Sequence, residues 1–217
     1  MSDELKRAEQ AVVAWGRIEV WLEEHAPCSR RRLPGPAAEE EIRDVEHRLD
    51  LVIPAELRAF YLLRNGTGPA SCFDWPVWGE PRPTPEEQWG GYLLPDGGIG
   101  PVAKPALWSG GPASLRRRKD PRLRYLPFAA TDPDGLYGLL IDCTPGEGYG
   151  RVGRYASALD PAPGLWPSLA AYLGEVADAL EERRSIEGSG SVPGLVGQSL
   201  SWGSPKTPAE GWRPLPG

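Results

Sequence analysis

The sequence is poor in the residues on which several large classes of protein depend. It has three cysteines (Cys28, Cys72 and Cys143) and two histidines in 217 residues, and the cysteines lie far apart without forming paired Cys/His motifs. This pattern disfavours a disulfide framework and a zinc site, and it favours a reducing compartment. We therefore expect a cytoplasmic protein with no metal and no other cofactor.

Long apolar runs and an excess of positive charge are also missing. No apolar stretch approaches the ~20 residues that a membrane-spanning helix needs, and acidic residues at Asp3, Glu4 and Glu9 make the N-terminus unlike a signal peptide. The net charge of −6 and the pI of about 5.1 disfavour a nucleic-acid binder that neutralises phosphates. We predict no membrane and no nucleic-acid partner, whereas an acidic surface is compatible with a basic protein partner.

Glycine and proline, by contrast, are abundant. The chain has 27 glycines and 25 prolines, about twice the usual share of these residues. They are sparse in residues 1–65 and dense in 66–122 and 185–217. We predict a single domain over residues 1–184 with a turn-rich insert at 66–122, followed by a disordered or loosely docked tail at 185–217.

Helices are predicted in the N-terminal part and near residue 170. Apolar residues recur at spacings of three and four over residues 3–25, 37–49 and 54–65, which predicts three amphipathic helices. The same spacing predicts a last helix over about 168–184, with Ser168 as its N-cap.

Strands are predicted between the insert and the last helix. The runs 123–129, 136–142 and 151–155 are strand-like, and short loops of turn-forming residues join them. Three strands joined in this way form an antiparallel meander. The sequence therefore predicts an α+β fold with a mostly antiparallel sheet, packed with N-terminal helices and a C-terminal helix.

Motifs that would indicate catalysis are absent, or the sequence around them does not fit the motif. Residues 148–153 match G-x-G-x-x-G, but a strand rather than a helix follows, so a turn leading into a strand explains them. Residues 132–135 (DPDG) begin like a calcium loop and lack its later ligands, which favours a hairpin turn. The sequence has no G-x-S-x-G, H-E-x-x-H or phosphate-binding P-loop motif. We predict no catalytic residue.

Several motifs together resemble a known family. The helical motifs are LPGP at 33–36, EEEI at 39–42, VEHRL at 45–49, IPAELRAFY at 53–61 and RNG at 64–66; the later ones are LPFA at 126–129, LLID at 139–142, the strand at 150–155 and SLAAYL at 168–173. These motifs resemble the SUKH superfamily in its Smi/Knr branch, over about residues 10–184. Ala38 departs from the pattern, because a Ser or Thr helix cap is common there, and the loss of such a cap costs ~1 kcal/mol.

The resemblance implies a non-enzymatic protein-binding domain. Bacterial members are regarded as immunity proteins that bind and neutralise a cognate toxin, and this is the function that we expect. The alternative is a regulatory scaffold like the fungal members, which would bind endogenous partners. A third alternative is a small-molecule enzyme without a recognisable motif.

Five residues are candidates for contacting a protein partner. Trp75 and Trp78 lie in the insert and could anchor an interface, since tryptophan is enriched at binding hot spots. Asp132, Asp134 and Tyr137 lie in and after the predicted hairpin turn, where the acids could meet basic side chains of a toxin. The alternative is that the tryptophans pin loops onto the core and that the acids only form the turn.

Overall fold

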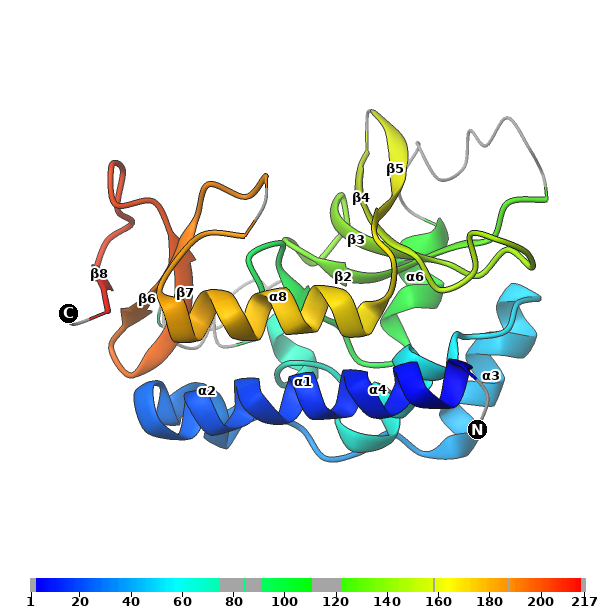
Figure 1. Cartoon of the computed structure of the whole chain (residues 1–217), viewed down its shortest axis with the longest axis horizontal. Coiled ribbons are helices and arrows are strands. Elements are labelled where there is room, and N and C mark those ends of the chain that lie inside the picture. Colours follow the sequence, from blue (N-terminus) through cyan, green and yellow to red (C-terminus); the bar gives the residue numbers. More distant parts are fainter. Residues whose placement is uncertain are drawn as a thin grey trace, which may run out of the picture.

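An antiparallel sheet and a group of helices share one core in the computed structural model, which describes residues 3–74, 84, 91–110, 122–157, 159–186 and 188–215 (Figure 1). The helices are α1 (Asp3–His25), α2 (Pro27–Arg32), α3 (Glu39–Leu49), α4 (Ala55–Leu63), the 3-10 turn η1 (Ala70–Phe73), α6 (Lys104–Gly110) and α8 (Leu169–Glu182). The strands are β1 (Gly98–Ile99), β2 (Tyr125–Ala130), β3 (Tyr137–Asp142), β4 (Val152–Ala156), β5 (Leu159–Trp166), β6 (Val192–Val196), β7 (Ser199–Gly203) and β8 (Trp212–Pro214).

The larger sheet has the strand order β1-β2-β3-β4-β5, with every pair antiparallel. The predicted α+β class with a mostly antiparallel sheet is confirmed, and β2, β3 and β4 are the predicted meander. The strands β1 and β5 were not predicted. Pro161 and Pro163 lie within β5, which is possible because β5 is an edge strand where a residue without an N–H breaks no internal ladder.

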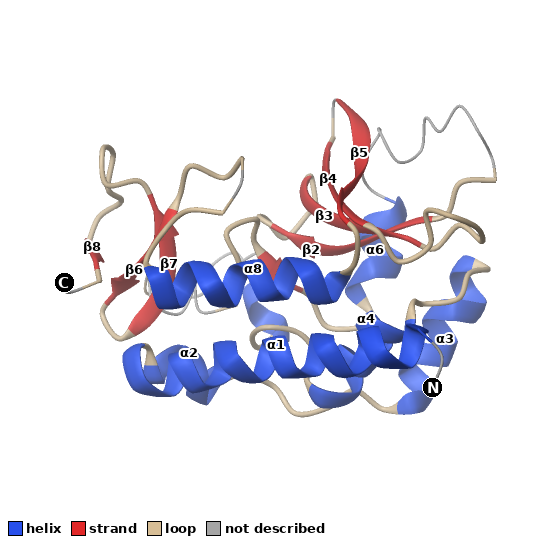
Figure 2. Cartoon of the chain, viewed as in Figure 1, coloured by secondary structure: helices blue, strands red, loops and turns tan. Residues whose placement is uncertain are grey.

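The helices α8 and α1 lie beneath this sheet in Figure 2, and α1 packs against both α4 and α8. Trp15, Ile18 and Leu22 are fully buried on α1, so the apolar stripe predicted for residues 3–25 faces the core. The helix α3 follows Ala38, which provides no side-chain cap, as the sequence predicted. Glu41 partly compensates, because its Oε2 accepts a hydrogen bond of 2.7 Å from the backbone N–H of Ala38.

The C-terminal segment corrects one expectation. Within residues predicted to be disordered or loosely docked, β6, β7 and β8 form a second sheet of order β7-β6-β8. Leu200 on β7 is fully buried in the main core, and its N–H donates to Ser29 Oγ at 3.0 Å. Many of the glycines and prolines here therefore lie in strands and turns of the sheet; Gly197, for example, takes a φ of 60° in the β6–β7 turn.

None of the helices in the described part of the chain is both long and apolar enough to cross a membrane.

Candidate protein-binding surface

The turn between β2 and β3 is held by hydrogen bonds from its own residues. Both carboxylate oxygens of Asp132 accept from the N–H of Leu136 at 3.2 Å, and the carbonyl of Asp132 accepts from the N–H of Gly135 at 3.1 Å. The N–H of Thr131 donates to the carbonyl of Tyr137 at 2.9 Å and closes the hairpin. The predicted hairpin turn at residues 132–135 is confirmed.

An aromatic cluster supports this turn from below. Trp108 on α6 is 2% exposed, and its Nε1 donates to the carbonyl of Pro133 at 3.1 Å. Its ring meets Phe73 edge-on at 6.2 Å between centroids, and Phe73 in turn lies 5.5 Å from Tyr92. Because Phe73, Tyr92 and Trp108 all belong to the insert at 66–122, the insert braces the turn. Trp108 thus pins a loop, which was one of the two roles considered for the insert tryptophans.

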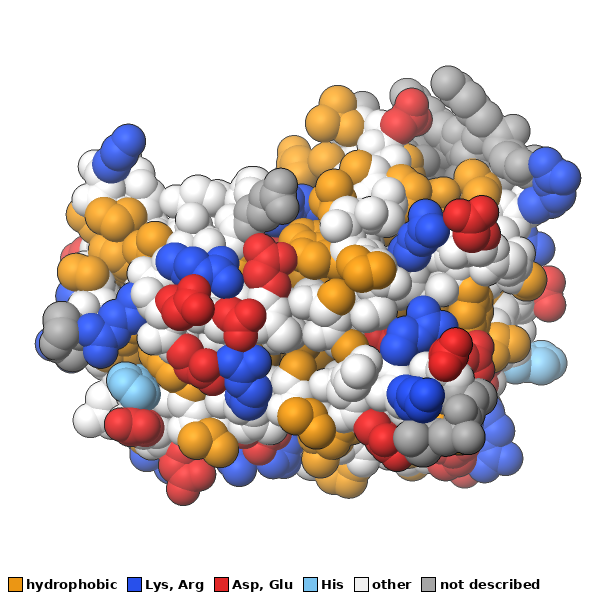
Figure 3. All heavy atoms as spheres, viewed as in Figure 1, with side chains coloured by type: hydrophobic (Ala, Val, Ile, Leu, Met, Phe, Trp, Pro, Cys, Tyr) orange, Lys and Arg blue, Asp and Glu red, His pale blue; other side chains and the backbone are white. Residues whose placement is uncertain are grey.

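Three exposed apolar side chains lie next to the turn. Tyr137 pairs with Ala156 on β4, and Ala156 pairs with Leu159 on β5, so these residues form a row across one face of the sheet. Tyr137 is 51% exposed and Leu159 is 68% exposed, and Leu136 adds to the same end of the sheet. Hydrophobic side chains are visible in Figure 3 on the β4–β5 hairpin, which projects from the body of the molecule.

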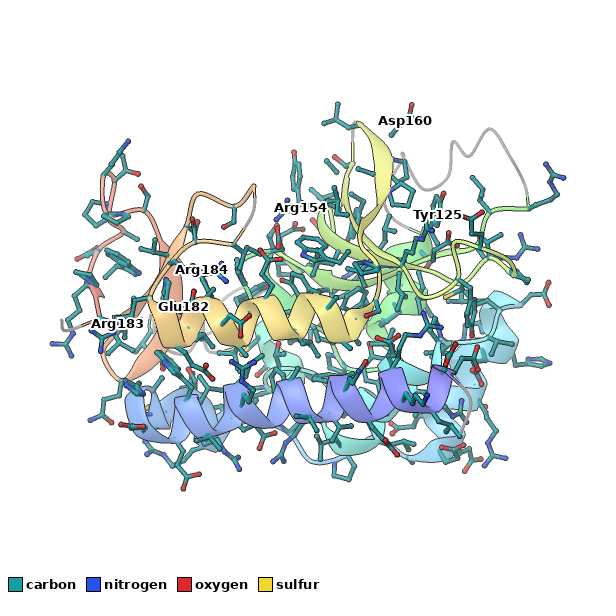
Figure 4. All side chains as sticks on the ribbon, in the orientation of Figure 1. Tyr125, Arg154, Asp160, Glu182, Arg183 and Arg184 are labelled. Carbon is teal, nitrogen blue, oxygen red and sulfur yellow. The ribbon has the colours of Figure 1, made fainter. Side chains whose placement is uncertain are left out.

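Two exposed acidic side chains are close in the chain to the residues of this apolar row. Asp134 is exposed in the turn, and Asp160 is exposed at the outer end of β5, where Figure 4 labels it. We call Asp134, Leu136, Tyr137, Leu159 and Asp160 the turn surface. An apolar centre with a charged rim is the arrangement found in many protein–protein interfaces.

The predicted site residues fall into three groups. Asp134 and Tyr137 lie together on the turn surface. Asp132 is half-buried and its carboxylate forms the turn, so its contact with a partner stays a prediction alongside the structural role. Trp75 and Trp78 lie outside the described residues.

The sequence reasoning missed Leu159 and Asp160 on the turn surface. The prolines at 161 and 163 hid the strand that carries them. The signal that was available is the length of the segment between the strand ending near residue 155 and the last helix, which is enough for one more strand.

A polar network fixes β4 to the rest of the molecule. Arg154 donates from Nε to Asp96 Oδ1 at 2.6 Å and lies 4.9 Å from the centroid of the Trp166 ring (Figure 4). Tyr172 on α8 donates its hydroxyl to Asp96 Oδ2 at 3.3 Å. Burial and the Asp96 carboxylate raise the pKa of Tyr172 well above its ordinary value, which keeps the hydroxyl protonated and able to donate. This network connects the β4–β5 hairpin to α8.

A hollow of about 1020 Å³ is lined by none of the turn-surface residues. Its lining includes Glu46, Asp50 and Tyr149. Glu46 accepts from the N–H of Ile53 at 2.9 Å and from Arg58 at 3.1 Å, and the carboxylate of Asp50 is 98% exposed. Burial raises the pKa of Tyr149 to about 12, above the range of a general base at neutral pH. The hydrogen bonds of Glu46, the exposure of Asp50 and the raised pKa of Tyr149 are typical of structural or solvent-facing groups rather than of an acid–base pair.

Among the residues that the structure describes, no three His, Cys, Asp or Glu side chains are grouped so that they could hold a metal ion.

These observations define an α+β protein with a braced, exposed surface suited to contact with another protein. The chain belongs to the SMI1 / KNR4 family (SUKH-1), whose sequence model matches residues 36–175. The family assignment confirms the resemblance and supports a non-enzymatic protein-binding domain. The helices α1 and α2, the end of α8 and all of the second sheet lie outside the matched range.

One relative is similar over a short segment. Over 57 residues the chain is 33% identical to the KNR4/SMI1 homolog of Kluyveromyces lactis. This segment covers 26% of the present chain and 11% of that protein, so the match spans about a tenth of the relative's length.

Proposed function

We propose that this chain is a bacterial, cytoplasmic immunity protein that binds and neutralises a cognate toxin through the turn surface. The observation that carries the proposal is the exposed pair Tyr137 and Leu159: Tyr137 follows the turn that the aromatic cluster braces, and Leu159 joins it through pairing across Ala156. A braced surface loses little conformational entropy when a partner binds, so apolar contacts there contribute fully to affinity.

The acids on the rim favour a basic partner. Asp134 and Asp160 are both exposed beside the apolar row, and the chain carries a net charge of −6. Opposite charges on a toxin would steer the encounter and set the orientation of the complex. Trp75 and Trp78 remain proposed anchors, and the cluster residue Phe73 lies close to them in the chain.

Side chains rather than backbone would make these contacts. The edge strand β5 contains two prolines, so it offers few N–H groups to a strand of a partner. This favours docking against the face of the hairpin over addition of a strand to its edge.

The test begins with affinity capture from the native host, followed by a toxicity-rescue assay with the protein that co-purifies. Tyr137→Ala and Leu159→Ala should each weaken binding about tenfold or more, as expected for hot-spot residues. Leu107→Ala on α6 is the matched control, because Leu107 is 62% exposed and lies outside the turn surface. If both turn-surface variants bind and rescue like the wild type, the proposed surface is wrong.

A regulatory scaffold is the second candidate, and the similarity to the KNR4/SMI1 homolog favours it. The two candidates differ in their genetic context. A toxin gene directly upstream supports immunity, whereas an isolated locus, together with an endogenous partner that is not toxic, supports the scaffold.

A further inference from the structure

A groove runs between the C-terminal halves of α1 and α8, on the far side of α8 from the turn surface. Its volume is about 540 Å³, and it is lined by Gly16, Arg17, Val20, Trp21, Glu24, His25, Glu181 and Arg183. We call it the α1–α8 groove. All of its lining residues lie outside the range 36–175 that the family shares, so the groove belongs to this chain's own extensions.

The two helices that form the groove are parallel. Arg7 on α1 lies 3.6 Å from Glu56, which in turn accepts from the N–H of Ala170 at the start of α8. Further along, Arg17 donates to Asp178 at 2.7 Å and to Glu181 at 2.6 Å. These pairs hold the helices at a fixed separation, and both helices run in the same direction in Figure 1.

The exposed side of α1 offers apolar contacts to a partner. Val13 is 65% exposed and Val20 is 67% exposed, and they lie seven residues, or about 10 Å, apart along the helix. Between them, a Cβ built on Gly16 would meet nothing within 4 Å, so a partner can approach the backbone closely. Trp21 lines the groove, and its ring stacks on the ring of His25 with 4.7 Å between the centroids.

The charges around the groove favour a basic partner. In the lining itself, Glu24 and Glu181 balance Arg17 and Arg183. Around the lining, Glu23, Asp178 and Glu182 add three carboxylates and Arg184 adds one guanidinium group, so acids are in excess by two. Figure 3 shows acidic and basic side chains side by side over this part of α1 and α8. Because the helices are parallel, their C-terminal ends, which carry partial negative charge, lie on the same side. A second copy of this chain would bring its own Glu23 and Glu24 to the groove, where like charges repel.

We propose that the α1–α8 groove is a second interaction surface, which binds a basic amphipathic helix of a partner protein. Helices that dock in grooves present apolar side chains at spacings of three, four and seven residues, and the seven-residue spacing matches Val13 and Val20. Lysine or arginine residues flanking those anchors would face the surplus of carboxylates. The partner on this groove is separate from the toxin proposed for the turn surface.

The experiment uses the full chain and two synthetic peptides of about 20 residues, each with leucines along one helical face. One peptide has lysine on its other positions and its counterpart has glutamate. Fluorescence anisotropy should show binding of the lysine peptide that weakens with salt, and binding of the glutamate peptide at least about tenfold weaker. Equal affinity for both peptides, or no binding of the lysine peptide, overturns the proposal.

Matched variants then locate the binding site. Val20→Lys should weaken binding of the lysine peptide at least about tenfold. Val52→Lys should leave that binding unchanged, because Val52 is 64% exposed and lies outside the groove. Equal effects of the two variants contradict the groove. Sedimentation of the wild type supports the proposal if the chain is monomeric; a dimer that Val20→Lys dissociates assigns the groove to a second copy and overturns it. Val20→Lys should still rescue from the toxin, so the two surfaces can fail independently.

Discussion

Tyr61 carries a hydroxyl group that is buried in the core and has no hydrogen-bond partner among the described residues. An unsatisfied buried hydroxyl costs the free energy of removing it from water, about 1–3 kcal/mol. Tyr61→Phe removes this cost and keeps the ring, so we expect the free energy of unfolding to rise by about 1 kcal/mol in urea denaturation.

Tyr172 provides the matched control for that substitution. It is equally buried, but its hydroxyl donates to Asp96 at 3.3 Å. Tyr172→Phe leaves the Asp96 carboxylate with one donor fewer, so this variant should lose stability. A destabilised Tyr61→Phe variant would show that its hydroxyl has a partner after all.

Glu56 is a buried carboxylate with an unusual pH dependence. Its Oε2 accepts from the N–H of Ala170 at 2.7 Å, but burial dominates and raises its pKa above the ordinary value of 4.5. The folded protein therefore binds an extra proton between the two pKa values. The stability that this group contributes is complete below about pH 4.5 and is lost as the pH rises through the folded pKa.

Glu19 should show the opposite dependence. Burial raises its pKa, but hydrogen bonds from Arg64 and Trp15 outweigh burial and lower the pKa below 4.5. Its contribution is present above about pH 4.5 and is lost as the pH falls through the folded pKa. As the pH rises through this range, the wild type should lose stability relative to Glu56→Gln and gain stability relative to Glu19→Gln. Urea unfolding of the three proteins at several pH values checks both expectations. Parallel changes would contradict both assignments.

At the scale of elements, the β2–β3 hairpin depends on a glycine. Gly135 has a φ of 64°, and a Cβ there would lie 2.3 Å from Trp108 Cδ1. Gly135→Ala should therefore cost more than the ~1 kcal/mol of a strained backbone alone, because the turn must move off the tryptophan. Gly146→Ala is the control, since its φ is also positive and its surroundings are open. Thermal unfolding should show a clearly larger loss at 135 than at 146.

The helices could be predicted because each has a regular apolar stripe. Residues such as Trp15, Ile18 and Leu22 on α1 follow the helical period, and packing did not override it. Short elements lacked this signal. The strand β1 has two residues, Gly98 and Ile99, and exists because it pairs with Ala129 and Ala130, which are distant in the chain.

The candidate site was predictable only in part, for a similar reason. Asp134 and Tyr137 could be found because the turn motif places them at a hairpin. Leu159 joins them through pairing across Ala156, and no local pattern indicates that register. The partners of the α1–α8 groove, Arg17 and Glu181, are 164 residues apart, so the groove depends on tertiary packing.

At the scale of the whole molecule, the C-terminal sheet completes the core of the shared domain. Leu200 is fully buried there, and Trp202 donates from Nε1 to the carbonyl of Leu93 at 2.9 Å. Its edge strand β7 also contacts α2, because the N–H of Leu200 donates to Ser29 Oγ at 3.0 Å. The segments before residue 36 and after residue 175 thus pack against each other as well as on the family core.

This arrangement predicts that the C-terminal sheet unfolds together with the rest. Leu200→Ala leaves a cavity in the common core and should cost about 2–5 kcal/mol, whereas Leu107→Ala, at 62% exposure, should change stability by less than about 0.5 kcal/mol. Urea unfolding followed by both tryptophan fluorescence and circular dichroism should give one coincident transition for each variant. A loosely docked sheet would behave differently: Leu200→Ala would leave the main transition in place, and only the amides of β6 and β7 would exchange faster.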